Sequence, residues 1–312
     1  MSDIVRIGII GTGSVGTSVA VSTLHAGIAR ELLLHDVRAH IAEGEAMDLA
    51  HGATFYPAAI VRPVTIDEML AADAVVIAAG RGGRPNESRL DLLKDNAAIV
   101  RNIARGLRDY AGLMVLVTNP VDVLTHEATL ASGLPPERVI GTGTMLDTAR
   151  LRHTIGHTLH VAPQSVHAQV IGEHGDSEIV LWSSARAGGI PLREWPAWTA
   201  DVEHRASHEV RTAAYEIIRR KGATNHAIGL VTTALLRAAL RNEQRILTVS
   251  RVQTGVLGLS DVALSLPTIV GRGGAIRVVT PDLDEDERER LQQSAAVLRQ
   301  SIGTLGATAD RV

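Results

Sequence analysis

The chain has 312 residues, which is enough for one large or two medium domains with a well-buried core. Its formal charge of -3 provides no basic field for nucleic acid, and only 2% of its residues are aromatic, so the core must be aliphatic. Cysteine is absent, which excludes disulfides, thiolate metal sites and cysteine nucleophiles, and we expect no bound metal.

The first residues, MSDIVRIGII, lack the basic region, apolar stretch and cleavage site of a signal peptide. No apolar run approaches the roughly 20 residues that are needed to span a bilayer. We therefore expect a cytoplasmic protein that has no membrane segment and no nucleic acid among its partners.

The first half of the chain alternates short apolar runs with segments of helical pattern. Strands are predicted at residues 5–10, 32–35, 74–79 and 114–117. Their apolar residues are continuous rather than alternating, which is typical of strands that are buried on both faces. A helical pattern at 90–107 follows the third strand. Strands that alternate with helices favour an α/β fold with a doubly wound parallel sheet.

The second half has a different pattern. It contains predicted strands at 164–171 and 246–256, a further pair at 262–270 and 275–279 joined through glycines, and long helical patterns at 202–221, 225–240 and 285–305. This is a mixed α+β arrangement. We place the boundary near residue 142, which gives a nucleotide-binding domain at 1–142 and a substrate domain at 143–312.

A glycine-rich loop directly follows the first strand and opens a helix. Its sequence is GTGSVG, and glycines at these spacings allow a tight turn and close approach of the backbone to a pyrophosphate. The helix N-terminus adds N–H groups and a positive dipole. The residues that we expect to bind the cofactor here are Gly11, Gly13, Ser14, Val15 and Gly16.

Asp36 stands at the end of the second strand, twenty residues after Gly16. An acid at this place meets the ribose hydroxyls of a dinucleotide. Because a carboxylate would repel the 2′-phosphate of NADP, the pattern favours NAD and a Rossmann-type domain. The alternative is that Asp36 only ends a strand and that the glycines form an ordinary turn.

Four further segments place polar residues in an apolar sequence: RGGRPNESR at 81–89, TNPVD at 118–122, LDTAR at 146–150 and GEHGD at 172–176. Open α/β sheets bind ligands at the carboxyl ends of their strands. A 2-keto acid needs a cation for its carboxylate, a proton donor for its carbonyl and a hydride source. Arginine and histidine supply the first two.

Each of these residues also has a purely structural interpretation. His174 alone could be an ordinary loop histidine, and Asp147 with Arg150 could be a surface pair three residues apart on a helix. Asn119 could form a turn before a proline, and Arg89 could be a solvated charge at a helix start. The case for chemistry therefore depends on their combination.

In combination, the chain resembles the lactate/malate dehydrogenase family over nearly its whole length. The similar motifs, in family order, are GTGSVG, DLAHG, SRLDLL, TNPVDVLT, GTGTMLDTAR, VIGEHGDSE, KGATNHAIG and ILTVS. The resemblance implies an NAD-dependent oxidoreductase of small 2-hydroxy and 2-keto acids, of glycolytic type and most like bacterial L-lactate dehydrogenases.

The resemblance also implies catalytic roles. His174 matches the residue that transfers the proton, and Asp147 matches the acid that holds this histidine and stabilises its imidazolium form. Arg89 matches the arginine of a mobile loop that polarises the reacting carbonyl group. We therefore expect hydride transfer accompanied by a His–Asp proton relay, with the loop closing as a lid.

Substrate and cofactor contacts follow from the same resemblance. Arg150 matches the arginine that binds the substrate carboxylate, and Asn119 matches an asparagine near the carbonyl and the nicotinamide. Thr224 matches a residue that lines the substrate pocket, and Gly80 matches a cofactor-binding glycine.

The resemblance breaks at the lid position that selects the substrate. Lactate dehydrogenases have Gln there and malate dehydrogenases have Arg, but this chain has Gly83. Gly83 could enlarge the pocket for bulkier 2-keto acids beside pyruvate. Alternatively, Arg84 or Arg81 could pair with a second carboxylate and give malate dehydrogenase activity. In the third interpretation, Gly83 is only a flexible loop residue.

Two cationic residues suggest regulation. Arg152 and His167 match positions at which many bacterial lactate dehydrogenases bind fructose 1,6-bisphosphate, and two such pairs across a symmetry axis could hold the two phosphates. Alternatively, both are ordinary interface residues. The resemblance implies a homo-oligomer, either a dimer or a tetramer, and a homotetramer is our expectation.

Overall fold

The computed structural model describes residues 5–83 and 88–309 of the chain. Its N-terminal half contributes parallel strands, namely β1 (Arg6–Ile10), β2 (Glu31–His35), β3 (Ile60–Pro63), β4 (Ala74–Ile77), β5 (Leu113–Leu116) and β6 (Val139–Gly141). They pair in the order β3-β2-β1-β4-β5-β6, so the direction of winding reverses between β1 and β4. Such a reversal opens a ligand crevice at the carboxyl ends of the strands. The predicted doubly wound parallel sheet is thus confirmed.

Helices cover both faces of these strands, and their bounds are α1 (Ser14–Ala26), α2 (Ala39–His51), α3 (Arg89–Gly106) and α4 (Val121–Ser132). Successive strand residues point to opposite faces. Ile9 therefore packs in the cluster that contains Val19 of α1, whereas Ile10 packs in the cluster that contains Ala97 of α3. This burial on both faces explains the continuous apolar runs in the sequence.

Two of the parallel strands were not predicted from the sequence. β3 lies at the edge of the sheet, and its residues are exposed or only partly buried, so it lacks the continuous apolar character of a central strand. β6 is buried but has only three residues. A short strand of this kind has no distinguishable periodicity.

The C-terminal half extends the same sheet with antiparallel strands. These are β12 (Arg245–Thr254), β13 (Ser260–Gly271) and β14 (Gly274–Val278). β12 joins the parallel part through a bridge between Ser250 and Gly141 of β6. The hairpin of β13 and β14 confirms the strand pair that was predicted at 262–270 and 275–279.

The strand predicted at 164–171 was wrong as one element. It is divided into a 3-10 turn (Pro163–Ser165), β7 (Val166–His167) and β8 (Val170–Ile171). β7 joins a three-stranded sheet with β10 (Arg186–Ala187) and β11 (Ile190–Pro191), whereas β8 pairs with β9 (Ile179–Val180). The chain changes sheets between β7 and β8, and apolar patterning cannot show such a change.

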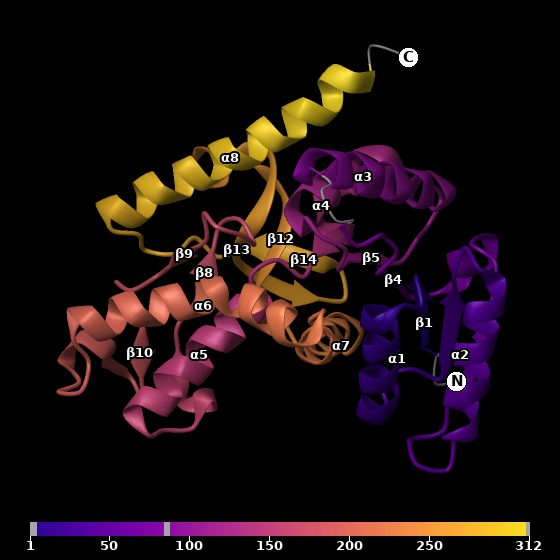
Figure 1. The fold of residues 1–312 in the computed structure, drawn as a ribbon, viewed down its shortest axis with the longest axis horizontal. Coiled ribbons are helices and arrows are strands. Elements are labelled where there is room, and N and C mark those ends of the chain that lie inside the picture. The colour runs from indigo at the N-terminus through magenta and orange to yellow at the C-terminus, as the bar shows by residue number, and fades with distance from the viewer. Residues whose placement is uncertain (1–4, 84–87, 310–312) are drawn as a thin grey trace.

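Four long helices complete this half: α5 (Met145–Leu159), α6 (Ala200–Lys221), α7 (His226–Leu240) and α8 (Glu285–Ala309). Short 3-10 turns lie at Asp67–Ala71, Pro136–Arg138, Leu192–Glu194 and Val256–Gly258. Figure 1 shows α8 (yellow) on the side of the sheet that carries α3 and α4, where it packs against α4 and β13. Within residues 5–83 and 88–309, no helix combines the length and apolarity that a bilayer span requires.

Helix α7 packs against α1, the helix that follows the glycine loop. The hydroxyls of Thr23 and Thr233 lie 3.2 Å apart in this buried contact. A Cβ atom added to Gly229 would lie 2.6 Å from the carbonyl oxygen of Ser18, so the backbones can approach this closely only because position 229 is glycine. The C-terminal half is thereby held beside the glycine loop.

Candidate active site

The glycine loop is shaped by its own packing. Gly11 has φ +94°, and an added Cβ there would lie 2.5 Å from the backbone nitrogen of Ala79. An added Cβ at Gly16 would lie 1.9 Å from the carbonyl oxygen of Gly11. At Gly13, by contrast, an added Cβ would meet no described atom within 4 Å. Gly11 and Gly16 are therefore required by the turn, and Gly13 leaves the loop open to a ligand.

Asp36 lies directly beside this loop. Its carboxylate accepts hydrogen bonds from the backbone N–H of Thr12 at 3.0 Å and from the backbone N–H of Arg38 at 3.0 Å. Burial disfavours the charge, but these donors and the Arg38 guanidinium outweigh burial and lower the pKa of Asp36. Asp36 is thus ionised at the place that the sequence predicted for a ribose-binding acid.

The loop and Asp36 fit the adenosine and pyrophosphate parts of NAD. Ser14 and Val15 form the first turn of α1, and no side chain in the described part of the chain caps that turn. Its backbone N–H groups therefore remain available to a phosphate. Because an added Cβ at Gly13 would meet no described atom within 4 Å, a phosphate can come close to these N–H groups.

Gly80 and Asn119 follow the carboxyl ends of the neighbouring strands β4 and β5. A Cβ added to Gly80 would lie 2.5 Å from Cγ2 of Thr118, so the two loops touch. The buried side chain of Asn96 joins them, because its amide donates to the carbonyl oxygens of Asn119 (3.2 Å) and Arg81 (3.3 Å). The sequence analysis missed Asn96, whose only signal is a polar residue on the buried face of α3.

His174, Asp147 and Arg150 form one connected cluster. Nδ1 of His174 lies 2.5 Å from Oδ2 of Asp147, and Nη1 of Arg150 donates to Oδ1 of Asp147 at 2.7 Å. The side chain of Asp147 is 3% exposed, whereas those of Arg150 and His174 are 15% and 23% exposed. The cluster therefore has a buried acid and two groups that a small ligand can reach.

The charges in this cluster favour a protonated histidine. Burial alone would lower the pKa of His174, but the charge of Asp147 and their hydrogen bond raise it to about 9. Burial would likewise raise the pKa of Asp147, but His174 and Arg150 outweigh it and lower the pKa. At neutral pH the pair is therefore an imidazolium beside a carboxylate, which can deliver a proton from Nε2.

The loop that carries His174 is held from two sides. The backbone N–H of His174 donates to Oδ2 of Asp122 in α4 at 2.7 Å. The backbone N–H of Glu173 donates to Oγ of Ser294 in α8 at 2.9 Å. Gly172 has φ +83°, and an added Cβ would lie 2.9 Å from the same Ser294 oxygen. Asp122 and Ser294 are further residues that the sequence analysis did not assign.

Helix α6 also contacts the loop of His174, because the hydroxyl of Tyr215 donates to Asp176 at 3.0 Å. Thr224 lies in the short linker between α6 and α7 and is partly buried. The next residue, Asn225, donates to the hydroxyl of Ser18 in α1 at 3.1 Å. The linker is thus fixed between the glycine-loop helix and the helix that contacts the loop of His174.

The segment predicted to act as a lid is described in part. Gly83 is exposed, and an added Cβ would lie 3.6 Å from Cδ2 of Leu92, which is an ordinary contact distance. Arg81 pairs with Asp95 at 2.7 Å. Arg84 lies outside the described residues. Arg89 is the first residue of α3, where the hydroxyl of Ser88 caps the helix, and only its backbone is described.

Arg152 contacts the backbone next to His167. Nε of Arg152 donates to the carbonyl oxygen of Ala168, the residue after His167, at 3.0 Å. Burial, together with the nearby charge of Arg245, lowers the pKa of Arg152. The structure thus links Arg152 to the residue that follows His167.

Comparisons with known proteins agree with this geometry. The NAD-binding domain of lactate/malate dehydrogenase matches residues 5–141, and the α/β C-terminal domain of lactate/malate dehydrogenase matches residues 144–308. The L-lactate dehydrogenase of Gloeobacter violaceus is 42% identical over 96% of this chain and 93% of its own length. That of Bacillus caldolyticus is 44% identical over 94% of this chain and 95% of its own length.

A solved structure is equally similar. The crystal structure of the minor L-lactate dehydrogenase from Enterococcus mundtii, in a ligand-bound form, aligns with a TM-score of 0.94 and 39% identity. The alignment covers 96% of this chain and 98% of that one. Fold, domain matches and full-length relatives therefore agree that this chain belongs to the lactate/malate dehydrogenase family and is an NAD-dependent 2-hydroxyacid dehydrogenase.

Proposed function

We propose that this protein is an L-lactate dehydrogenase that interconverts pyruvate and lactate. The observation that carries the proposal is the cluster in which Asp147 contacts both His174 (2.5 Å) and Arg150 (2.7 Å). It combines a proton donor with a cation for the substrate carboxylate. The named relatives, which are L-lactate dehydrogenases over nearly the whole chain, support this choice.

In the proposed mechanism, NAD supplies the hydride when it is bound. Arg150 binds the substrate carboxylate, because Nη1 alone is engaged by Asp147 and its other N–H groups bond to no residue in the described ranges. Nε2 of protonated His174 then donates its proton to the carbonyl oxygen. Asp147 stabilises the imidazolium before transfer and orients the ring throughout.

Three further residues complete the proposed substrate site. Arg89 stabilises the negative charge that develops on the carbonyl oxygen when the lid closes. Asn119 contacts the carbonyl and nicotinamide region, and Thr224 lines the pocket. The glycines of the loop, Gly80 and Asp36 hold the cofactor.

Substrate selectivity depends on Gly83. With no side chain there, the pocket would accept pyruvate and bulkier 2-keto acids. The alternative is malate dehydrogenase activity through Arg84 or Arg81. The guanidinium of Arg81 already pairs with Asp95 at 2.7 Å, so its use for a second substrate carboxylate would require that pair to break.

The test is the kcat/KM of NADH oxidation with pyruvate, oxaloacetate and a branched 2-keto acid. We expect pyruvate and the branched acid to be reduced well and oxaloacetate poorly. If oxaloacetate is preferred by orders of magnitude, the protein is a malate dehydrogenase. An arginine other than Arg150 then binds the second carboxylate.

We further propose a cytoplasmic, glycolytic homotetramer that fructose 1,6-bisphosphate activates at Arg152 and His167. The hydrogen bond from Arg152 to the residue after His167 supports a shared phosphate site, and two such sites across an axis would hold one bisphosphate. The division between the cofactor and substrate domains is placed at residue 142. Light scattering with and without the bisphosphate tests the assembly, and Arg152→Gln should abolish activation without lowering basal activity.

A further inference from the structure

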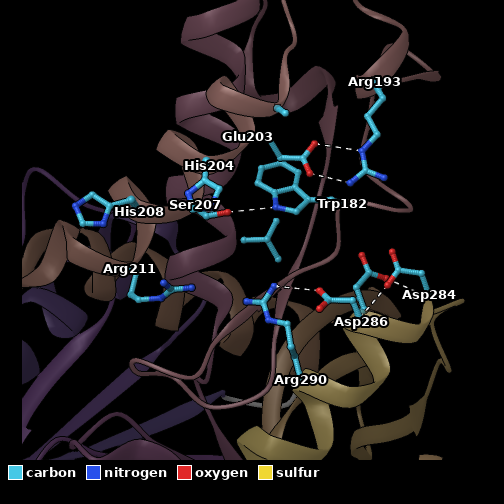
Figure 2. Close-up of a pocket in the computed structure, with 13 residues that line it drawn as sticks. Trp182, Arg193, Glu203, His204, Ser207, His208, Arg211, Asp284, Asp286 and Arg290 are labelled. Carbon is cyan, nitrogen blue, oxygen red and sulfur yellow. Dashed lines mark hydrogen bonds and ion pairs between the residues drawn. The ribbon is translucent and has the colours of Figure 1, made fainter.

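A separate cavity of about 480 Å³ lies between α6, the segment around β9 and the start of α8. Figure 2 shows the residues that line it, with Trp182 near the middle of the view. None of the residues of the proposed catalytic cluster lines this cavity. It is therefore a hollow distinct from the proposed active site.

Two of the four acids that line the cavity are engaged by neighbouring groups. Glu203 pairs with Arg193 at 2.8 Å. The buried carboxylate of Glu287 accepts hydrogen bonds from the backbone N–H of Ser183 at 3.0 Å and from its hydroxyl at 2.6 Å. Of the other two, Asp286 lies 3.7 Å from Arg290, and Asp284 accepts a hydrogen bond from the backbone N–H of Glu287 at 2.8 Å.

A row of side chains with N–H groups lies on α6. His204, His208 and Arg211 are spaced four and three residues apart, so they share one face of the helix. In Figure 2 they lie on one side of Trp182, and Asp284 and Asp286 lie on the other. The acid that α6 itself contributes to the cavity lining is Glu203, which is already paired with Arg193.

Arg211 lacks a counter-ion within the described part of the chain. Its buried Nε has no hydrogen-bond partner, and no ion pair within 4.0 Å involves it. The charge of Arg211 acts on the pKa of Glu178. Glu178 is 3% exposed, and its Oε1 has no hydrogen-bond partner in the described part of the chain. Burial raises the pKa of Glu178, so this carboxyl is a poor source of negative charge for Arg211.

We propose that this cavity binds a small oxyanion, a carboxylate or a phosphate, through Arg211 with His204 and His208. A buried guanidinium N–H that lacks an acceptor is costly, and a bound oxyanion would satisfy the Nε–H of Arg211 with a strong charge-assisted hydrogen bond. The indole of Trp182 provides an apolar surface for the remainder of the ligand. The site is independent of the proposed lactate dehydrogenase activity.

The test is isothermal titration calorimetry of the full-length protein with phosphate and, separately, with acetate, at an ionic strength held constant with chloride. Saturable binding of either anion is expected, and the tighter of the two identifies the ligand class. Arg211→Gln should weaken binding at least about tenfold. Arg205→Gln, which removes the same charge from the same helix outside the cavity lining, should leave binding unchanged.

The proposed active site could itself bind an anion through Arg150. If the cavity is the binding site, the Arg150→Gln variant should still bind the anion. Loss of anion binding in this variant would assign the binding to the active site and overturn the proposal. The absence of saturable binding, or equal weakening by Arg205→Gln and Arg211→Gln, would also overturn it. Because His208 is exposed, His208→Gln is a second variant that should fold normally and should weaken binding severalfold.

Discussion

The backbone N–H of His174 donates a 2.7 Å hydrogen bond to the carboxylate of Asp122, a residue 52 positions earlier in the chain. Asp122 is the second residue of α4 and lies three residues after Asn119, close to the carboxyl end of β5. The bond therefore attaches the proposed proton donor to the edge of the sheet where the cofactor-binding loops gather. Asp122 is 2% exposed, so water competes little for this contact.

Asp122→Ala should lower kcat/KM for pyruvate about 10- to 100-fold, because the loop would lose its anchor and the imidazole its position. Asp122→Asn keeps an acceptor oxygen and should retain most of the activity. In the Asp122→Asn variant, the alkaline limb of the pH profile of kcat/KM should move to lower pH, because the charge of Asp122 helps to raise the pKa of His174. Equal losses in both variants would contradict the anchoring role.

Asp147→Asn should change the pH dependence of catalysis in a definite direction. Reduction of the keto acid requires protonated His174, whose pKa is raised to about 9 mainly by Asp147 against the effect of burial. Without the carboxylate the pKa falls, so the alkaline limb of kcat/KM should shift down by more than about one unit. We expect activity at pH 7 to fall by about 10²-fold or more.

Lactate oxidation in the same variant provides the control, because it uses the neutral imidazole. The acidic limb of its kcat/KM, which reports loss of the neutral imidazole, should therefore also move to lower pH. If the alkaline limb of Asp147→Asn stays at the position of the wild type, another group supplies the proton.

Glu178 should make stability depend on pH. Burial raises its pKa to about 8 from an ordinary 4.5, so the folded state favours the neutral carboxyl. A folded-state pKa above the unfolded value gives stability that is complete at low pH and is lost as pH rises from about 4.5 through 8. The difference in free energy of unfolding between Glu178→Gln and wild type should therefore change by about 4 kcal/mol in favour of the variant from pH 4 to pH 9.

Denaturant unfolding at several pH values measures this difference. The comparison uses the change with pH, because a buried glutamine amide has a cost of its own that does not vary with pH. Glu209→Gln on the exposed face of α6 is the matched control and should show no comparable trend. A constant difference between Glu178→Gln and wild type would show that the carboxyl is ionised without penalty.

The sequence was sufficient for much of the fold and for the central cluster. The strands around Ile9 and Val75 are buried on both faces, so their apolar runs are continuous, and Asp147 and Arg150 are three residues apart on one helix. The contacts of Asp122 and Asn96 could not be predicted. Each joins segments that are distant in sequence, and a polar residue in a motif or helix does not indicate its partner.

Gly83 offers the sharpest test of substrate selectivity. An added Cβ there would lie 3.6 Å from Leu92 and the backbone φ is not left-handed, so a larger side chain can be introduced without a clash at its base. Gly83→Arg should raise the ratio of kcat/KM for oxaloacetate to that for pyruvate by about 10²-fold or more. The new guanidinium would pair with the second carboxylate of oxaloacetate and would remain unpaired beside pyruvate.

Gly82→Arg is the matched control, since an added Cβ at Gly82 meets no described atom within 4 Å and the charge change is the same. It should leave the substrate ratio nearly unchanged. Gly83→Gln should instead reduce activity with bulkier 2-keto acids, because it fills the space that glycine leaves. If Gly82→Arg and Gly83→Arg shift the ratio equally, selectivity follows the net charge of the lid rather than the position that faces the substrate.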